Sequence, residues 1–446
     1  MHISLTPQLP SRVVLPASKS ISARALIVNE LAELPCMLSN LSDCDDTKAM
    51  LRALDGDTEL VDVGAAGTAM RFLSAYYSTR VGKEHLLTGT ERMKHRPIGI
   101  LVEALRQLGA DIEYVGEPGF PPLRIRGRKL RGGTLSIKAD VSSQYISALL
   151  MLGPLLEQGL ELHLEGTIAS RPYIEMTLRL METFGAVTAF EGSTISVRPG
   201  SYQRFEPMVV EPDWSAASYW FELVALSPAP DAHVFLEGLK PGFPNSSAQS
   251  LQGDSICAEY FRLLGVETTF TPSGAMLTKA SATAEAAVPL CLDFSGCPDL
   301  AQTFVVTAAL QNRPFRFTGL QSLKIKETDR IAALIAEAAK LGKMLYESAE
   351  GELAYDGPTA AEQGSAAAEQ GITAAEQSSA ATISIATYED HRMAMAFAPA
   401  AYLFPDLYIE HPEVVSKSYP DFWESLPIQS PPASSSQPFP SSALPF

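Results

Sequence analysis

Six segments of the chain share one pattern, in which small or polar residues lead into a dense apolar run. They span residues 18–31, 67–77, 142–155, 213–226, 299–310 and 390–403. Ser, Gly and Asp suit a helix start because they satisfy, or leave accessible, the backbone N–H groups that lack a partner there. A helix that is apolar nearly all round belongs inside a domain. The pattern predicts six buried helices, three in each half of the chain, with open N-terminal ends.

A second recurrent unit consists of a short strand ending at Gly, a loop, an amphipathic helix, and a Gly before the next apolar run. It is found at residues 86–110, 162–186, 234–266 and 315–343. The Gly after each helix fits a C-terminal cap with positive φ. The 446 residues are 46% hydrophobic, enough to bury more than one core. Together the two units predict an α/β protein of two pseudo-threefold domains that face one another.

Cations recur at or near the predicted helix starts, although the chain has a net charge of -17. The acidic balance argues against broad binding to nucleic acids or to anionic membranes, which requires a basic face. The cationic motifs are Lys19-Ser20, Arg96-Pro97, residues 326–330 (KETDR) and residues 390–392 (DHR). Because helix N-termini carry partial positive charge, these motifs predict a small-anion site between the domains.

Taken singly, each of the six segments is more typical of an ordinary capped core helix than of a ligand site. Their recurrence, with cations after four of the caps, favours the anion site. The five cysteines lack metal-ligand spacing, and His391 has no second ligand nearby in sequence, so we expect no metal and no cofactor. The N-terminus lacks a signal-peptide pattern and no apolar run reaches the length of a membrane span, so we expect a cytoplasmic protein.

Seven ordered motifs resemble the enolpyruvyl transferase family, and most closely its 3-phosphoshikimate 1-carboxyvinyltransferase (EPSP synthase) branch. The motifs are residues 15–24 (LPASKSISAR), 64–71 (GAAGTAMR), 93–98 (MKHRPI), 142–145 (SSQY), 170–173 (SRPY), 326–330 (KETDR) and 390–395 (DHRMAM). They cover nearly the whole chain.

The resemblance implies a two-domain, inside-out α/β barrel fold with three βαβαββ repeats in each domain. One domain would comprise residues 1–17 plus 213–426, and the other residues 18–212. The implied substrates are phosphoenolpyruvate and shikimate 3-phosphate, both anions, without nucleic acid or membrane as a partner. Because such an active site lies between two domains of one chain, we expect a monomer.

The resemblance also assigns catalytic residues. Asp299 is the carboxylate that takes the 5-hydroxyl proton of shikimate 3-phosphate, and without the family match it is predicted to be a helix N-cap. Glu327 and Lys19 are alternative proton donors to C3 of phosphoenolpyruvate, and the sequence does not decide between them. Such an addition needs a base, an acid and cations around the phosphate and carboxylate.

Two sets of binding residues follow from the same resemblance. The residues implied for shikimate 3-phosphate are Lys19, Ser20, Arg24, Ser142, Ser143, Gln144, Ser170, Tyr173, Asp299, Ser322 and Lys326. The residues implied for phosphoenolpyruvate are Lys19, Gly67, Arg96, Gln144, Arg330, Arg392 and Lys417. Several have plainer interpretations, among them Ser142 as a cap, Tyr173 as a core residue and Lys417 as a surface lysine.

Three positions depart from the usual family pattern. Ala23, Ala65 and Ser322 stand where many members have Asn. Ala65 removes one amide contact beside phosphoenolpyruvate, whereas Gly67 is retained. We therefore expect an active enzyme that glyphosate, a competitor of phosphoenolpyruvate in this family, inhibits.

Two segments fall outside the resemblance. Residues 357–380 contain a short direct repeat of TAAEQ type and are expected to form a surface insertion. Residues 427–446 are rich in Pro and Ser and are expected to be a disordered tail.

Two alternative functions fit the sequence less well than the transferase. UDP-N-acetylglucosamine enolpyruvyl transferases use a loop Cys as acid, but the region around Arg96 has Lys94 and His95 and no Cys. A catalytically inactive anion-binding homologue would lack the acid, the base or a phosphate-binding cation, and all three are present in this sequence.

Overall fold

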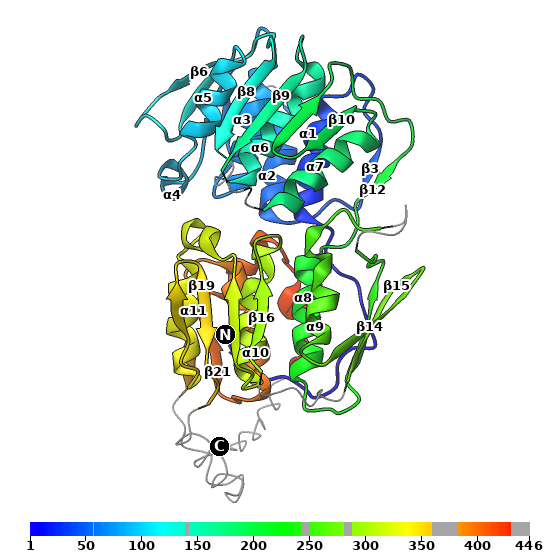
Figure 1. The fold of residues 1–446 in the computed structure, drawn as a ribbon, viewed down its shortest axis with the longest axis vertical. Helices are drawn as coiled ribbons and strands as arrows, with labels where there is room; N and C mark the ends of the chain where they lie inside the picture. Colours follow the sequence, from blue (N-terminus) through cyan, green and yellow to red (C-terminus); the bar gives the residue numbers. More distant parts are fainter. Residues whose placement is uncertain are drawn as a thin grey trace, which may run out of the picture.

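The computed structural model describes residues 1–56, 58–138, 142–166, 168, 170–242, 249–280, 288–358 and 382–429. Its chain forms two bodies stacked along the long axis (Figure 1), each with its own hydrophobic core. One core draws its residues from Ala17 to Val210, and the other from Ile3 to Leu15 and from Trp214 to Leu426. We call these the upper and the lower body, as Figure 1 places them.

The upper body contains seven helices and ten strands among the described residues. The helices are α1 (Lys19–Glu30), α2 (Asp45–Leu54), α3 (Gly67–Ser78), α4 (Glu91–Lys94), α5 (Gly99–Gln107), α6 (Ser143–Leu152) and α7 (Arg171–Thr183), with the 3₁₀ turn η1 (Gly153–Leu155). The strands are β3 (Leu38–Ser39), β4 (Leu60–Asp62), β5 (Glu84–Thr88), β6 (Asp111–Tyr114), β7 (Leu123–Arg126), β8 (Gly133–Lys138), β9 (Leu160–Glu165), β10 (Thr188–Glu191), β11 (Thr194–Val197) and β12 (Met208–Val209).

The lower body combines the N-terminal strands with the second half of the chain. Its helices are α8 (Trp214–Leu226), α9 (Cys257–Arg262), α10 (Ala301–Leu310), α11 (Arg330–Lys340), α13 (His391–Phe397) and α14 (Phe422–Ser425), with the 3₁₀ turns η2 (Gly253–Ile256), η3 (Pro298–Leu300), η4 (Gln321–Ile325), η5 (Ala398–Tyr402) and η6 (Pro412–Lys417). Its strands are β1 (His2–Ile3), β2 (Arg12–Val13), β13 (His233–Glu237), β14 (Val266–Thr271), β15 (Gly274–Lys279), β16 (Leu290–Asp293), β17 (Phe315–Thr318), β18 (Tyr346–Ala349), β19 (Glu352–Tyr355), β20 (Ile383–Ile385) and β21 (Leu407–Ile409).

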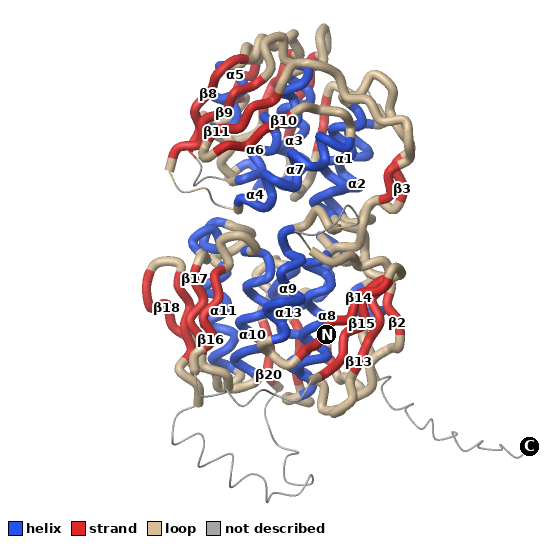
Figure 2. Tube along the Cα trace, turned by 45° about the vertical axis from the view of Figure 1, so that its right-hand side comes forward, coloured by secondary structure: helices blue, strands red, loops and turns tan. Residues whose placement is uncertain are grey.

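The sheets repeat one topology. In four of them a parallel pair is followed by two antiparallel strands, in the orders β4-β5-β7-β6, β8-β9-β11-β10, β2-β13-β15-β14 and β16-β17-β19-β18. The two remaining sheets, β3-β12 and β1-β21-β20, also contain a parallel pair. A parallel pair requires a crossover connection, and a helix supplies it in each body. Helices line the interior and sheets the outside in both bodies (Figure 2), as the predicted inside-out α/β fold requires.

The six predicted buried helices are α1, α3, α6, α8, α10 and α13. Every residue of α3 and of α10 is buried. The Gly residues predicted to end helices have positive φ, from +71° at Gly342 to +106° at Gly109. One detail was wrong: the helix predicted from residue 299 begins at Ala301, and Asp299 lies in the preceding turn η3 without capping it.

The chain crosses between the two bodies twice. Ala17 and Pro212 form an antiparallel bridge, the Ser18 N–H donates to the Glu211 carbonyl over 2.8 Å, and the Asp213 N–H donates to the Pro16 carbonyl over 2.9 Å. The paired crossing brings the start of α1 beside the start of α8. No helix among the described residues is long and apolar enough to cross a membrane.

The insertion predicted at residues 357–380 and the tail predicted at 427–446 lie almost wholly outside the described residues.

Candidate active site

A cleft of about 840 Å³ lies between the two bodies. Every residue implied for catalysis or substrate binding lines it. From the upper body come Lys19, Ser20, Arg24, Gly67, Arg96, Ser142, Ser143, Gln144, Ser170 and Tyr173, and from the lower body come Asp299, Ser322, Lys326, Glu327, Arg330, Arg392 and Lys417. The cleft thus unites residues that are up to about 400 positions apart in the chain.

Helices α1, α3, α6, α7 and α8 begin at or beside residues that line this cleft. The Ser142 hydroxyl accepts the Gln144 N–H at 3.3 Å, so its predicted capping role is real, and it lines the cleft as well. Asp213 caps α8 through Ala216 N–H at 3.0 Å and also accepts the Lys19 N–H at 3.2 Å. One carboxylate therefore ties together the starts of α1 and α8, at the crossing between the bodies.

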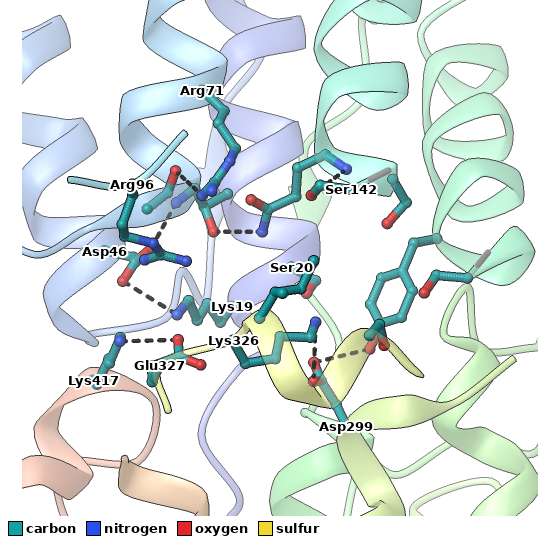
Figure 3. A pocket seen from close by; sticks show the side chains of 18 of the residues that line it. Lys19, Ser20, Asp46, Arg71, Arg96, Ser142, Asp299, Lys326, Glu327 and Lys417 are labelled. Atoms are coloured by element: carbon teal, nitrogen blue, oxygen red, sulfur yellow. Dashed lines mark hydrogen bonds and ion pairs between the residues drawn. The ribbon is translucent and has the colours of Figure 1, made fainter. Parts of the chain in front are cut away.

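Asp299 stands at the floor of the cleft among three cations (Figure 3 shows it beside Lys326). Its carboxylate lies 3.0 Å from Arg392 Nη2, 3.3 Å from Arg330 Nη1 and 3.7 Å from Lys326 Nζ. The Tyr173 hydroxyl donates to Oδ2 over 3.1 Å. Burial acts to raise the pKa of Asp299, but the three cations outweigh it and hold the pKa well below its usual range. Asp299 is consequently an anion in the free protein.

Arg330 joins three carboxylates at the start of α11. It is 1% exposed, and its guanidinium lies 2.6 Å from Asp390, 2.8 Å from Glu327 and 3.3 Å from Asp299. Lys417 lies 2.9 Å from Glu327 and is not a solvated surface lysine, since its side chain is 17% exposed. Burial acts to raise the pKa of Glu327, yet Arg330 and Lys417 lower it well below its usual value.

Lys19 faces Glu327 from the upper body and pairs with Asp46 at 3.2 Å (Figure 3). Burial acts to lower the pKa of Lys19, but Asp46, with Cys44 and Glu327, raises it above the usual value. Of the two candidate proton donors, Lys19 therefore carries its proton in the free protein and Glu327 does not.

Two arginines of the upper body, Arg71 and Arg96, line the cleft. Arg71 donates to the Gly67 carbonyl over 2.9 Å, and in the part of the chain that the structure describes no carboxylate lies within ion-pair distance of Arg71 or Arg96. Burial, with the neighbouring Arg96, lowers the pKa of Arg71. These guanidinium groups are suited to a bidentate anion such as a carboxylate or phosphate.

Arg24 is a further buried cation that lines the cleft. It donates to Thr177 Oγ1 over 2.7 Å, to the Ser20 carbonyl over 2.9 Å and to Ser147 Oγ over 3.1 Å. Burial lowers its pKa to about 10.

Ser170, at the start of α7, has a positive φ of 54°, a strained conformation for a residue other than Gly that is common at functional sites.

The cleft is positive in an acidic protein. Its lining contains eight lysines and arginines but four carboxylates, an excess of four positive charges. Among the described residues no group of three or more His, Cys, Asp or Glu is placed to hold a metal ion. Such a site can bind two multiply charged anions side by side and hold a carboxylate between them.

Several lining residues were not predicted as site residues: Asp46, Arg71, Asp213, Ser215 and Tyr219. The sequence could have identified Arg71 as a site residue, since it is the last residue of the motif at residues 64–71. Asp46 and Asp213 resembled ordinary caps or first-turn acids. Their role depends on partners 27 and 194 positions away, at Lys19.

Two of the three departures from the family pattern fall outside the cleft lining. Ala65 is exposed and Ala23 is buried within α1, whereas Ser322 lines the cleft.

Comparison with known proteins gives one family. The family model described as EPSP synthase (3-phosphoshikimate 1-carboxyvinyltransferase) matches residues 5–58 and 56–426. A 3-phosphoshikimate 1-carboxyvinyltransferase of Bacteroides fragilis is 53% identical over 425 residues, covering 95% of this chain and 96% of the relative. One from Cellvibrio japonicus is 35% identical over 451 residues, covering 95% and 98%.

A solved structure shares the fold at lower sequence similarity. The EPSP synthase of Acinetobacter baumannii superposes with a TM-score of 0.70 at 21% identity, covering 95% of this chain and 97% of that one. Since the family match runs nearly from end to end and the curated relatives agree with it, the chain belongs to the EPSP synthase family.

Proposed function

We propose that this protein transfers the enolpyruvyl group of phosphoenolpyruvate to the 5-hydroxyl of shikimate 3-phosphate and releases phosphate. The observation that carries the proposal is Asp299: an ionised carboxylate held between the two bodies, within 4 Å of three cations, in a cleft with an excess of positive charge. It works without a cofactor, as a cytoplasmic monomer.

The substrates are assigned to the two sides of the cleft by charge and by hydroxyl groups. Shikimate 3-phosphate would lie over Asp299, with its phosphate among Ser20, Ser142, Ser143, Ser170, Ser322, Gln144, Arg24 and Lys326, and its ring beside Tyr173. Phosphoenolpyruvate would lie over Glu327, held by Lys19, Gly67, Arg96, Gln144, Arg330, Arg392 and Lys417. Guanidinium groups of the upper and the lower body would bind its carboxylate and its phosphate.

The proposed reaction is an addition followed by an elimination. Asp299 takes the proton of the 5-hydroxyl as its oxygen bonds to C2, and an acid delivers a proton to C3, which becomes a methyl group. In the second step C3 loses a proton, the double bond returns, and the bond from C2 to the phosphate oxygen breaks. Cations fixed in place before reaction stabilise the charge that develops.

The two proton donors are coupled through the bound anion. Lys19 holds its proton in the free protein, whereas Glu327 is held ionised by Arg330 and Lys417. Phosphoenolpyruvate would draw those cations to its own charges, and the pKa of Glu327 would then rise. Both groups stay candidates for the C3 proton.

Phosphate release from phosphoenolpyruvate tests the proposed function. Purified protein receives shikimate 3-phosphate or UDP-N-acetylglucosamine in separate reactions without added metal. The proposal predicts release with shikimate 3-phosphate alone. Release only with the nucleotide sugar favours the related transferase, and release with neither favours an inactive anion-binding homologue.

Gly67 gives a prediction about phosphoenolpyruvate binding. A Cβ at this position would lie 2.5 Å from Arg96 Nη1 and 2.7 Å from Arg71 Nη1, so both guanidinium groups would have to move. We expect Gly67→Ala to raise KM for phosphoenolpyruvate by about tenfold, the effect of one weakened charge-assisted hydrogen bond. KM for shikimate 3-phosphate should change little. Gly200→Ala, at a site without a left-handed φ and with no atom within 4 Å of its added Cβ, controls for the loss of a glycine. An unchanged KM for phosphoenolpyruvate would remove Arg96 from the proposed site.

Inhibition by glyphosate follows from the same wall of the cleft. Because Gly67 leaves Arg71 and Arg96 unobstructed, we expect glyphosate to compete with phosphoenolpyruvate. Indifference to millimolar inhibitor, measured against varied phosphoenolpyruvate, would contradict this.

We also propose that residues 1–17 plus 213–426 and residues 18–212 are two domains that close over the substrates. Ile325 lines the cleft yet is 76% exposed, and Ile100 is 42% exposed, so closure would cover apolar surface. Dianions would also attract cations of both bodies. Small-angle scattering should show a smaller radius of gyration with shikimate 3-phosphate than without it, and an unchanged radius would count against closure.

A further inference from the structure

A second buried carboxyl group lies behind Asp299. Asp254, in the turn η2, is 4% exposed and does not line the cleft. The hydroxyl of Tyr173 stands between the two, 3.1 Å from Asp299 Oδ2 and 3.4 Å from Asp254 Oδ1. A tyrosine hydroxyl has one proton to donate, so it can donate to one of the two carboxylates at a time.

The contacts continue into a closed ring. The Ser215 hydroxyl donates to Asp254 Oδ2, Arg392 Nη2 lies 3.4 Å from Ser215 Oγ, and the same Nη2 lies 3.0 Å from Asp299 Oδ2. Four members of this ring belong to the lower body, and only Tyr173 comes from the upper body. Asp254 is therefore held rigidly, and its link to Asp299 passes through a residue of the other body.

The surroundings of Asp254 favour a proton near neutral pH. Burial first, and then the negative charge of Asp299, raise its pKa to about 7, against the lowering effect of Ser215 and Arg392. The titratable or charged groups that face it are Tyr173 from α7, Asp213 at the N-cap of α8, Cys257 from α9, Cys297 and Asp299 from the segment around η3, and Arg392 from α13. Burial also raises the pKa of both thiols, of the tyrosine and of Asp213, and the pKa of about 7 belongs to Asp254.

We propose that Asp254 is a positioning residue for the transfer reaction, which sets the strength of the base Asp299 through the hydroxyl of Tyr173. This rests on the proposed function of Asp299. When Asp254 carries a proton, it donates to Tyr173 Oη, and Tyr173 donates to Asp299 and weakens it as a base. When Asp254 is ionised, Tyr173 can turn to it, and Asp299 loses a hydrogen bond.

We expect kcat to rise with pH. Loss of the Asp254 proton strengthens the base, so kcat rises as the pH increases through about 7. Asp254→Asn fixes a neutral group that still donates to Tyr173, and so mimics the protonated form. The variant should match the parent protein near pH 6, lose the rise near pH 7, and fall behind by about tenfold at pH 8.5, the effect of one charge-assisted hydrogen bond on the base.

The test is the dependence of kcat on pH between 5.5 and 9 with saturating phosphoenolpyruvate and shikimate 3-phosphate. Tyr173→Phe keeps Asp254 but cuts the link, so it should also lose the rise near pH 7, whatever its effect on KM. Glu222→Gln is the matched control: it replaces another fully buried carboxyl group of the lower body by an amide, on α8 but outside the cleft lining, and should keep the parent profile.

Each outcome decides. Loss of the rise in Asp254→Asn and in Tyr173→Phe, but not in Glu222→Gln, supports the proposal. A rise that persists in Asp254→Asn, or in Tyr173→Phe if the first variant does not fold, overturns it. Absence of phosphate release by the parent protein at every pH would instead refute the proposed function.

Discussion

Replacing Asp299 by Asn is expected to lower kcat by about 10³-fold, within the range reported for loss of a positioned general base. The amide keeps the size of the side chain but cannot take the substrate proton. Because three cations lose a competing carboxylate, KM for either anionic substrate should stay the same or fall. Steady-state kinetics with each substrate varied in turn separates the two effects.

Asp293→Asn is the matched control for Asp299. It neutralises a carboxylate six positions earlier that lies outside the cleft lining and bonds to Ser295. This variant should retain the parent kcat. If Asp299→Asn keeps more than about a tenth of the parent kcat, the base in this protein is another group.

Removing Arg330 is expected to have the largest effect on stability. Arg330→Met leaves Asp390, Glu327 and Asp299 without their shared cation, and breaking one buried pair typically costs about 3–5 kcal/mol of unfolding free energy. Arg316→Met, which removes a cation paired at the surface with Asp356, should cost less than about 1 kcal/mol. Urea unfolding of both variants gives the comparison, and equal losses would contradict the central role of Arg330.

The carboxylates around Arg330 also predict how the difference in stability between the parent protein and Arg330→Met depends on pH. Cations, Arg330 among them, hold the pKa of Asp299 and Glu327 below the unfolded values of 3.8 and 4.5. The stability contributed by these ionised carboxylates is fully present above about pH 5 and is lost as the pH falls through their folded pKa values. In Arg330→Met the carboxyl groups accept protons more readily. The gap in stability between parent and variant should therefore narrow on acidification, and a gap that is constant from pH 7 to pH 4 would argue for lost packing alone.

Local chemistry explains which parts of the fold could be predicted. The six buried helices follow from caps and apolar runs, and the glycines that end helices follow from the need for positive φ at Gly109, Gly185, Gly265 and Gly342. Asp299 was misread as a cap when considered without the family resemblance, because a polar residue before an apolar run has the same pattern whether it bonds to backbone N–H groups or to distant arginines. Its partners Tyr173 and Arg392 are 126 and 93 positions away.

The prediction of the site residues depended on the family resemblance more than on any single sequence pattern. Serines and cations at helix starts predicted an anion site, but nothing in the sequence placed Lys19 beside Asp46 or Asp254 behind Tyr173. Those contacts arise only when the crossing at Ala17 and Pro212 stacks one body on the other. Contacts between residues this far apart in the chain produce no local sequence pattern from which they could be predicted.

Addition and elimination at C2 and C3 of phosphoenolpyruvate are tested most directly by running the reaction in D2O and examining the product by mass spectrometry and NMR. We expect phosphoenolpyruvate and shikimate 3-phosphate to give 5-enolpyruvylshikimate 3-phosphate with solvent deuterium on its vinyl carbon, because C3 passes through a methyl group before it loses a proton. Product without deuterium would contradict the addition and elimination proposed for this cleft, and formation of pyruvate and phosphate alone would contradict its role as a transferase.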